Sequence, residues 1–266
     1  MPRAMAALVH ELRLFFVALQ FLPRLPVPVW VGWEPAHLNR AVRHFALVGG
    51  LVGTVGAAVV WCAQLVWPPM VAATLAVATT LWLTAAFHED GLADTFDALL
   101  GGAPRDTALA IMKDSRIGSY GSLALVLAVL TKVALLVLLA QYSVALAVAA
   151  LFGAHVTSRL VPLWVIRTLP HVGDTARSKS KPLADTIGNA GLLAAMTWWL
   201  AAMALLLWLQ PGAPWPQALL GALLALAWMW RLLKRRLQGF TGDGLGATQQ
   251  ISELAFYLGL LLGLPA

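Results

Sequence analysis

The sequence predicts an all-α fold, a polytopic bundle of transmembrane helices built as a single integral membrane domain over residues 1–266. Three observations predict it: 60% of the residues are hydrophobic, only 11% are charged, and the mean hydropathy is +0.79. A soluble protein covers its surface with about 25–35% charged residues. Since this chain cannot do so, the lipid bilayer is its expected solvent.

The N-terminal segment is expected to lie along the membrane and not to cross it. Residues 12–22 are apolar, but Pro23, Pro26 and Pro28 end the run. A membrane span needs about 20 apolar residues. We therefore expect an interfacial or re-entrant helix at this end of the chain.

Roughly seven further runs are long and apolar enough to span the hydrocarbon core. Small residues inside two of them, such as Gly49 with Gly53 and Gly259 with Gly263, have the spacing that lets membrane helices approach closely. The runs lie near residues 44–67, 70–88, 119–140, 143–166, 190–209, 216–232 and 247–264.

The connections between these runs alternate between bare and charged. The bare turns hold no Asp, Glu, Lys or Arg, whereas the charged connections lie near residues 89–119, 167–189 and 231–246. All the charged connections, together with the N-terminal arginines, should therefore lie on one side of the bilayer.

Loops rich in Lys and Arg stay in the cytoplasm, which gives the chain an expected orientation. We expect a multi-pass protein of the bacterial inner membrane, with a cytoplasmic N-terminus and a periplasmic C-terminus. The net charge of +6 then describes a face beside anionic lipid and gives no reason to expect nucleic-acid binding.

An acidic cluster follows the second run. Four of the twelve acidic residues, Glu89, Asp90, Asp94 and Asp97, fall within nine positions. In a helix, Asp90, Asp94 and Asp97 share one face within about 60°. One or two Mg²⁺ or Mn²⁺ ions would relieve their repulsion and keep open sites for substrate phosphates. The alternative is a solvated helix cap, since acidic residues are favourable near a helix N-terminus.

Basic residues that could bind phosphate occur in three places. Lys113 and Arg116 flank Asp114, which could be a metal ligand or a base, although this block also suits an ordinary cytoplasmic flank. Arg159 lies four residues after His155 inside a span, where phosphate binding, pairing with the acidic cluster and a purely structural pair all remain open. A basic loop suits either lipid headgroups or phosphates, and its charged residues are Arg177, Lys179 and Lys181.

A glycine-rich block precedes the last run. Gly242, Gly244 and Gly246 surround Asp243, and we expect a tight substrate-binding loop whose backbone N–H groups suit a phosphate. Asp243 could supply a further metal ligand, or it could simply cap the following helix.

These blocks converge on the cytoplasmic ends of different spans, and metal-assisted phosphoryl transfer is the simplest chemistry that uses them all. A cation transporter or channel is one alternative, but it predicts carboxylates spread across the membrane depth. A non-catalytic membrane scaffold is another alternative, but it does not explain the acidic cluster.

Four segments make the sequence resemble the cobalamin synthases, the adenosylcobinamide-GDP ribazoletransferases. They are residues 14–26, His-Glu-Asp-Gly-Leu-Ala-Asp-Thr-Phe-Asp at 88–97, Met-Lys-Asp-Ser-Arg-Ile-Gly at 112–118 and Thr-Gly-Asp-Gly-Leu-Gly-Ala at 241–247. The acidic block also resembles, in part, that of CDP-alcohol phosphotransferases, although Asp94 stands where their motif has arginine.

The resemblance implies a Mg²⁺-dependent transferase that acts in cobalamin biosynthesis. It would join adenosylcobinamide-GDP and α-ribazole, or α-ribazole 5′-phosphate, to give adenosylcobalamin, or its 5′-phosphate, and GMP. Asp94 or Asp114 would be the base, and the acidic cluster would hold the metal. A homo-oligomer or an association with other cobalamin-assembly enzymes is also expected.

Overall fold

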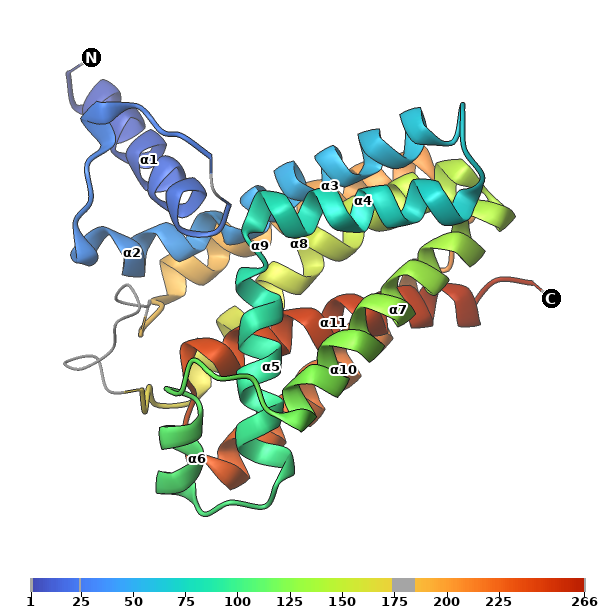
Figure 1. The fold of residues 1–266 in the computed structure, drawn as a ribbon. Helices are drawn as coiled ribbons and strands as arrows, with labels where there is room; N and C mark the ends of the chain where they lie inside the picture. The colour runs from blue at the N-terminus through green and yellow to red at the C-terminus, as the bar shows by residue number, and fades with distance from the viewer. Residues whose placement is uncertain (1, 24, 174–184, 266) are drawn as a thin grey trace.

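The computed structural model describes residues 2–23, 25–173 and 185–265, in which every named element is a helix (Figure 1). Within these ranges the only β-type pairing is an isolated bridge between His171 and Phe240. The expected all-α class is therefore confirmed. The elements are α1 (Pro2–Phe21), η1 (Val29–Val31), α2 (Pro35–Ala41), η2 (Val42–His44), α3 (Phe45–Ala63), α4 (Pro69–Thr84), α5 (Phe87–Leu100), α6 (Arg105–Ile111), α7 (Ser119–Tyr142), α8 (Val144–Thr168), α9 (Asn189–Leu209), α10 (Trp215–Arg236) and α11 (Gly242–Leu262).

Helix α8 lies at the centre of the bundle and packs against α3, α7, α9, α10 and α11. Glycines of α3 allow this helix to lie very close to α8, because a Cβ on Gly53 of α3 would lie 2.9 Å from the Leu151 carbonyl oxygen of α8. Glycine also lets α10 and α11 pack closely, because a Cβ on Gly259 of α11 would lie 3.0 Å from the Ala218 Cα of α10. The glycine spacing thus marks helix contacts, as the sequence predicts.

Five helical segments are long and apolar enough to span a membrane, and a sixth is obtained if the bent pair α4 and α5 counts as one span. The chain is therefore a multi-pass membrane protein, but the predicted count of seven is not confirmed. The five segments are Ala36–Ala63, Ser119–Tyr142, Val144–Thr168, Asn189–Leu209 and Trp215–Arg236.

The expected run over residues 70–88 breaks before its end. Helix α4 ends at Thr84, and Ala85 and Ala86 both take left-handed backbone conformations with φ of 54°. The chain then turns through 87° into α5. A left-handed conformation costs a non-glycine residue about 1–2 kcal/mol, so the surrounding packing must hold this turn. The turn separates the acidic residues from the apolar run and gives them a helix of their own.

The expected run over residues 247–264 is part of α11 but falls outside the candidate spans. The polar residues Gln249, Gln250 and Glu253 lie in the middle of this helix, and all three side chains are buried. Helix α11 therefore turns its polar face toward the other helices.

Helix α1 is longer than the apolar run that predicted it, and it is absent from the candidate spans found in the described residues. Glu11 joins it to the start of the first span, because its carboxylate lies 3.0 Å from Arg43 Nη1 and 3.2 Å from His44 Nε2. Met5 and Leu8 remain exposed on its surface.

The bare turns and the charged connections lie at opposite ends of the bundle. Figure 1 shows α1, α2 and the α5–α6 connection at one end, and the α3–α4 turn, the α7–α8 turn and the C-terminus at the other. The α9–α10 turn belongs to the second group, since a Cβ on Gly263 would lie 3.0 Å from the Pro214 side chain. The predicted alternation of connections is thus present in the fold.

Candidate active site

The acidic helix α5 crosses the first turns of α11 at very close range. A Cβ on Gly91 would lie 2.9 Å from the Asp243 carbonyl oxygen, and a Cβ on Gly246 would lie 3.2 Å from the His88 carbonyl oxygen. Only glycine leaves room for the two backbones here. The crossing brings Asp243 beside the acidic residues of α5, although about 150 positions separate them in the sequence.

Asp90, Asp94 and Asp243 form a carboxylate cluster at this crossing. Asp90 is exposed and the other two are partly buried. The negative charges of Asp243, Asp90 and Asp97 all act on the carboxylate of Asp94, and that of Asp90 also acts on Asp243. The ion pairs of Arg105, Arg116 and Lys132 are made with other carboxylates. Carboxylates so close together favour a bound proton or cation between them.

The chemistry of this donor set suits a hard divalent cation. In the part of the chain that the structure describes, no three His, Cys, Asp or Glu side chains are arranged to hold a metal ion by themselves. Mg²⁺, however, is usually bound through one or two carboxylates, while waters and substrate phosphates complete its shell. A cluster of oxygen ligands fits this mode of binding.

Asp97 is turned toward a neighbouring helix. Its carboxylate accepts hydrogen bonds from the backbone N–H groups of Gly118 at 2.7 Å and Gly121 at 2.8 Å, at the start of α7. A carboxylate there accepts hydrogen bonds from the free N–H groups, and the positive end of the helix dipole stabilises its negative charge. Asp97 therefore fixes α7 to α5, and both of its oxygens are engaged.

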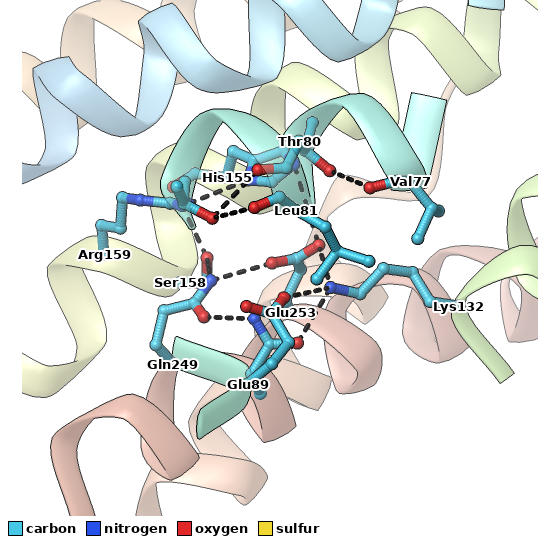
Figure 2. A network of polar contacts seen from close by, with 12 residues as sticks. Val77, Thr80, Leu81, Glu89, Lys132, His155, Ser158, Arg159, Gln249 and Glu253 are labelled. Carbon is cyan, nitrogen blue, oxygen red and sulfur yellow. Dashed lines mark hydrogen bonds and ion pairs between the residues drawn. The ribbon is translucent and has the colours of Figure 1, made fainter. Parts of the chain in front are cut away.

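Glu89 points away from the carboxylate cluster into the centre of the bundle. Its side chain is almost fully buried, and its Oε1 lies 3.7 Å from Lys132 Nζ on α7. Lys132 Nζ is also 3.1 Å from Glu253 Oε1 on α11, and it donates a hydrogen bond to Gln250 Oε1 at 2.9 Å. This lysine thus joins three helices inside the bundle (Figure 2).

His155 and Arg159 extend this buried network from α8 (Figure 2). Arg159 Nη1 donates to His155 Nδ1 at 2.8 Å, and His155 Nε2 lies 3.8 Å from Glu253 Oε1. Gln249 Nε2 donates to both Ser158 Oγ and Glu253 Oε2 at 2.8 Å. Two cations, Lys132 and Arg159, therefore face two carboxylates, those of Glu89 and Glu253.

Asp114 and Arg116 form an exposed ion pair in the turn before α7. Arg116 Nη2 donates to Asp114 Oδ2 at 2.6 Å, and Arg116 Nε donates to Oδ1 at 3.0 Å. The guanidinium holds the pKa of Asp114 down at about 2. So weak a base is poorly suited to accept a proton from a hydroxyl group at neutral pH.

The three glycines around Asp243 lie in the first turns of α11, where a loop was expected. Thr241 caps this helix, since its Oγ1 accepts a hydrogen bond from Gly244 N at 3.1 Å. Gly242 follows the cap directly, and Gly246 makes the contact with α5. The glycines therefore place the start of α11 against α5.

The remaining predicted phosphate ligands lie in different places. Lys113 is exposed beside Asp114. Arg159 is buried in the central network, where it donates to His155. Arg177, Lys179 and Lys181 lie outside the described residues.

Lys132 is the principal residue that the sequence reasoning missed. A lysine at the centre of the 119–140 run was a visible signal, because a charge at that depth needs a partner. Glu253 gives the same signal on the last helix, and the structure pairs the two.

Comparison with known proteins identifies the family. A family model described as cobalamin-5-phosphate synthase (CobS) matches residues 14–261. An adenosylcobinamide-GDP ribazoletransferase of Leptothrix cholodnii is 49% identical over 260 residues, covering 97% of this chain and 98% of the relative. One of Albidiferax ferrireducens is 52% identical over 276 residues, with 95% and 99% covered. No solved structure matches the chain significantly. The chain belongs to the CobS family of cobalamin-5-phosphate synthases.

Proposed function

We propose that this protein is an adenosylcobinamide-GDP ribazoletransferase, which carries out the final assembly step of cobalamin. Its substrates are adenosylcobinamide-GDP and α-ribazole or α-ribazole 5′-phosphate. The ribose 3′-oxygen forms a bond to the phosphorus attached to cobinamide, and the bond from that phosphorus to the bridging oxygen breaks. GMP leaves, and adenosylcobalamin or its 5′-phosphate is formed. The names of the relatives and the carboxylate cluster at the α5–α11 crossing support this assignment.

One or two carboxylates of the cluster formed by Asp90, Asp94 and Asp243 would hold Mg²⁺, or Mn²⁺ in its place, and waters and substrate phosphates would be its other ligands. Such an ion neutralises charge that develops on the diphosphate and on the leaving GMP. The single observation that carries this proposal is the convergence of three carboxylates from two helices.

Asp94 is the better candidate for the base that accepts the proton of the ribose hydroxyl. It is partly buried at the α5–α11 crossing, beside Asp90 and Asp243, where the metal and the diphosphate would lie. Asp114, the other candidate, is tied to Arg116 at 2.6 Å. We assign Asp114 the task of orienting Arg116 in the turn before α7.

Substrate phosphates would be bound by groups at the same end of the bundle. Arg116 keeps an exposed guanidinium there, and Lys113 precedes it in the same turn. The first N–H groups of α11 add a positive helix end beside Asp243. The basic loop with Arg177, Lys179 and Lys181 is also assigned to polyphosphate capture.

The orientation expected from the charges would put this end in the cytoplasm and the C-terminus in the periplasm of a bacterial inner membrane. Single cysteines introduced into a Cys62→Ser variant test it. A membrane-impermeant thiol reagent should label Gly212→Cys on intact spheroplasts, and Ser115→Cys only after lysis. The opposite labelling would reverse the proposed topology.

The decisive assay measures GMP release by the purified protein in lipid nanodiscs. Wild type should release GMP from adenosylcobinamide-GDP when α-ribazole 5′-phosphate and Mg²⁺ are both present, and EDTA should stop it. Asp94→Asn should lower the rate by about a hundredfold or more, the usual contribution of a base. Asp106→Asn is the matched control, because Asp106 is an exposed acid on the neighbouring helix α6. Transport of Mg²⁺ without GMP release would instead support a transporter.

A further inference from the structure

A pocket lies behind the carboxylate cluster, between the end of α1 and helices α3, α5, α8 and α11. The pocket is partly open to the exterior. Arg159 and Leu163 line it from α8, and Gly242, Leu245 and Gly246 line it from α11. The chemistry proposed above does not use this pocket.

Aromatic rings form one side of the pocket. Phe21 and Phe45 are nearly parallel, with ring centroids 5.9 Å apart, and Phe87 meets Phe21 edge-on at 5.3 Å. Flat apolar walls of this kind suit a planar aromatic occupant, which can stack or meet the rings at their edges. A phosphate group would lose its hydration against these rings without gaining a hydrogen bond from them.

Two buried polar atoms on the pocket residues lack partners. Arg159 Nε and His88 Nδ1 make no hydrogen bond within the described part of the chain, and their side chains are only 3% and 5% exposed. Leaving such groups unpaired is costly in a folded protein. The occupant should therefore carry an acceptor for the Arg159 Nε–H group, which a hydrocarbon chain does not have.

The pocket is adjacent to the proposed reaction centre. Gly242 lines it, and the next residue, Asp243, belongs to the carboxylate cluster. On α5, His88 lines it two residues before Asp90. An occupant would thus lie directly behind the helix pair that carries the carboxylates, within reach of a substrate whose other end is at the cluster.

We infer that this pocket binds the benzimidazole base of the ribazole substrate, with its free ring nitrogen accepting a hydrogen bond from Arg159 Nε. The base is a planar fused ring with one in-plane acceptor, so it matches both the aromatic walls and the unpaired donor. Its ribose would then extend toward Asp94. The inference rests on the proposed function and adds to it the site that selects the base.

Filling the pocket tests this assignment. Leu163→Trp should raise the KM for α-ribazole 5′-phosphate by about tenfold or more, with the KM for adenosylcobinamide-GDP unchanged, because only one substrate loses binding. Leu160→Trp, one turn earlier on α8 and outside the pocket lining, is the matched control and should change neither KM. Equal changes in both KM values, or none, would overturn the inference. If wild type itself releases no GMP, the proposed function fails instead.

A second measurement needs only the wild-type protein and so does not depend on how a variant folds. Equilibrium dialysis should show that an analogue with CH in place of the free ring nitrogen binds about tenfold or more weakly than α-ribazole 5′-phosphate, the loss typical of a hydrogen bond to a charged donor. Arg159→Met should bind the two compounds equally. Equal binding of both compounds by wild type would refute the contact, and a copurified lipid chain retained in the presence of ribazole phosphate would refute the pocket assignment.

Discussion

Lys132 holds together the buried polar network, and its removal offers a sharp test of the packing. Its Nζ lies 3.1 Å from Glu253 Oε1 and 3.7 Å from Glu89 Oε1, and its side chain is only 6% exposed. Lys132→Met keeps the length of the side chain but removes its charge. Among the described residues that the two carboxylates face, Arg159 would then supply the positive charge.

The expected loss of stability is about 3–5 kcal/mol, the usual cost of removing one partner from a buried ion pair. It should appear as a clear drop in the thermal unfolding midpoint of the purified protein in a fixed detergent. Lys132→Met combined with Glu253→Gln should recover a large part of the loss, since the number of buried carboxylates then again matches the one remaining cation, Arg159. Leu130→Met is the matched control, because Leu130 is 61% exposed on the same helix.

Two results would refute this reasoning. The first is an unfolding midpoint for Lys132→Met that equals that of Leu130→Met. The second is a double variant whose loss equals the sum of the two single losses, since residues that share an ion pair should couple.

Three other changes test the geometry around the site. Gly91→Ala should destabilise the protein by about 1–3 kcal/mol through overpacking against Asp243, and it should also slow GMP release; a fully active variant would contradict the close crossing of α5 and α11. Asp97→Ala should cost about 1–2 kcal/mol as a lost helix cap and leave the Mg²⁺ dependence of the rate unchanged, so a large rise in the Mg²⁺ requirement would make Asp97 a ligand. Ala86→Gly should raise the unfolding midpoint, because glycine relieves about 1 kcal/mol of left-handed strain, and a lower midpoint would argue against that strain.

Much of the fold could be predicted from hydropathy and charge alone. Apolar length identifies the spans, and the alternation of bare and charged connections assigns them to two ends. The break at Ala85 and Ala86 could not be predicted, because alanine favours helix and nothing in the local sequence marks a turn. Tertiary packing sets that turn and with it the count of spans.

For the candidate site, the sequence predicts which carboxylates share one face of a helix, but not which groups each of them contacts. The periodicity places Asp90, Asp94 and Asp97 together, but it does not say what each carboxylate meets. Asp97 meets two backbone N–H groups of α7, and Glu89 points to the other side of α5 toward Lys132. The approach of Asp243 depends on the crossing of two helices far apart in sequence, which no local pattern encodes.

Mn²⁺ binding, followed by electron paramagnetic resonance, tests the carboxylate cluster most directly. Purified wild type with adenosylcobinamide-GDP should bind Mn²⁺ tightly, and Asp106→Asn should bind it equally well. The variant with Asp90, Asp94 and Asp243 all changed to Asn should lose this binding while it keeps its helical circular dichroism spectrum. Unchanged Mn²⁺ binding by a folded triple variant would contradict the assignment of the metal site.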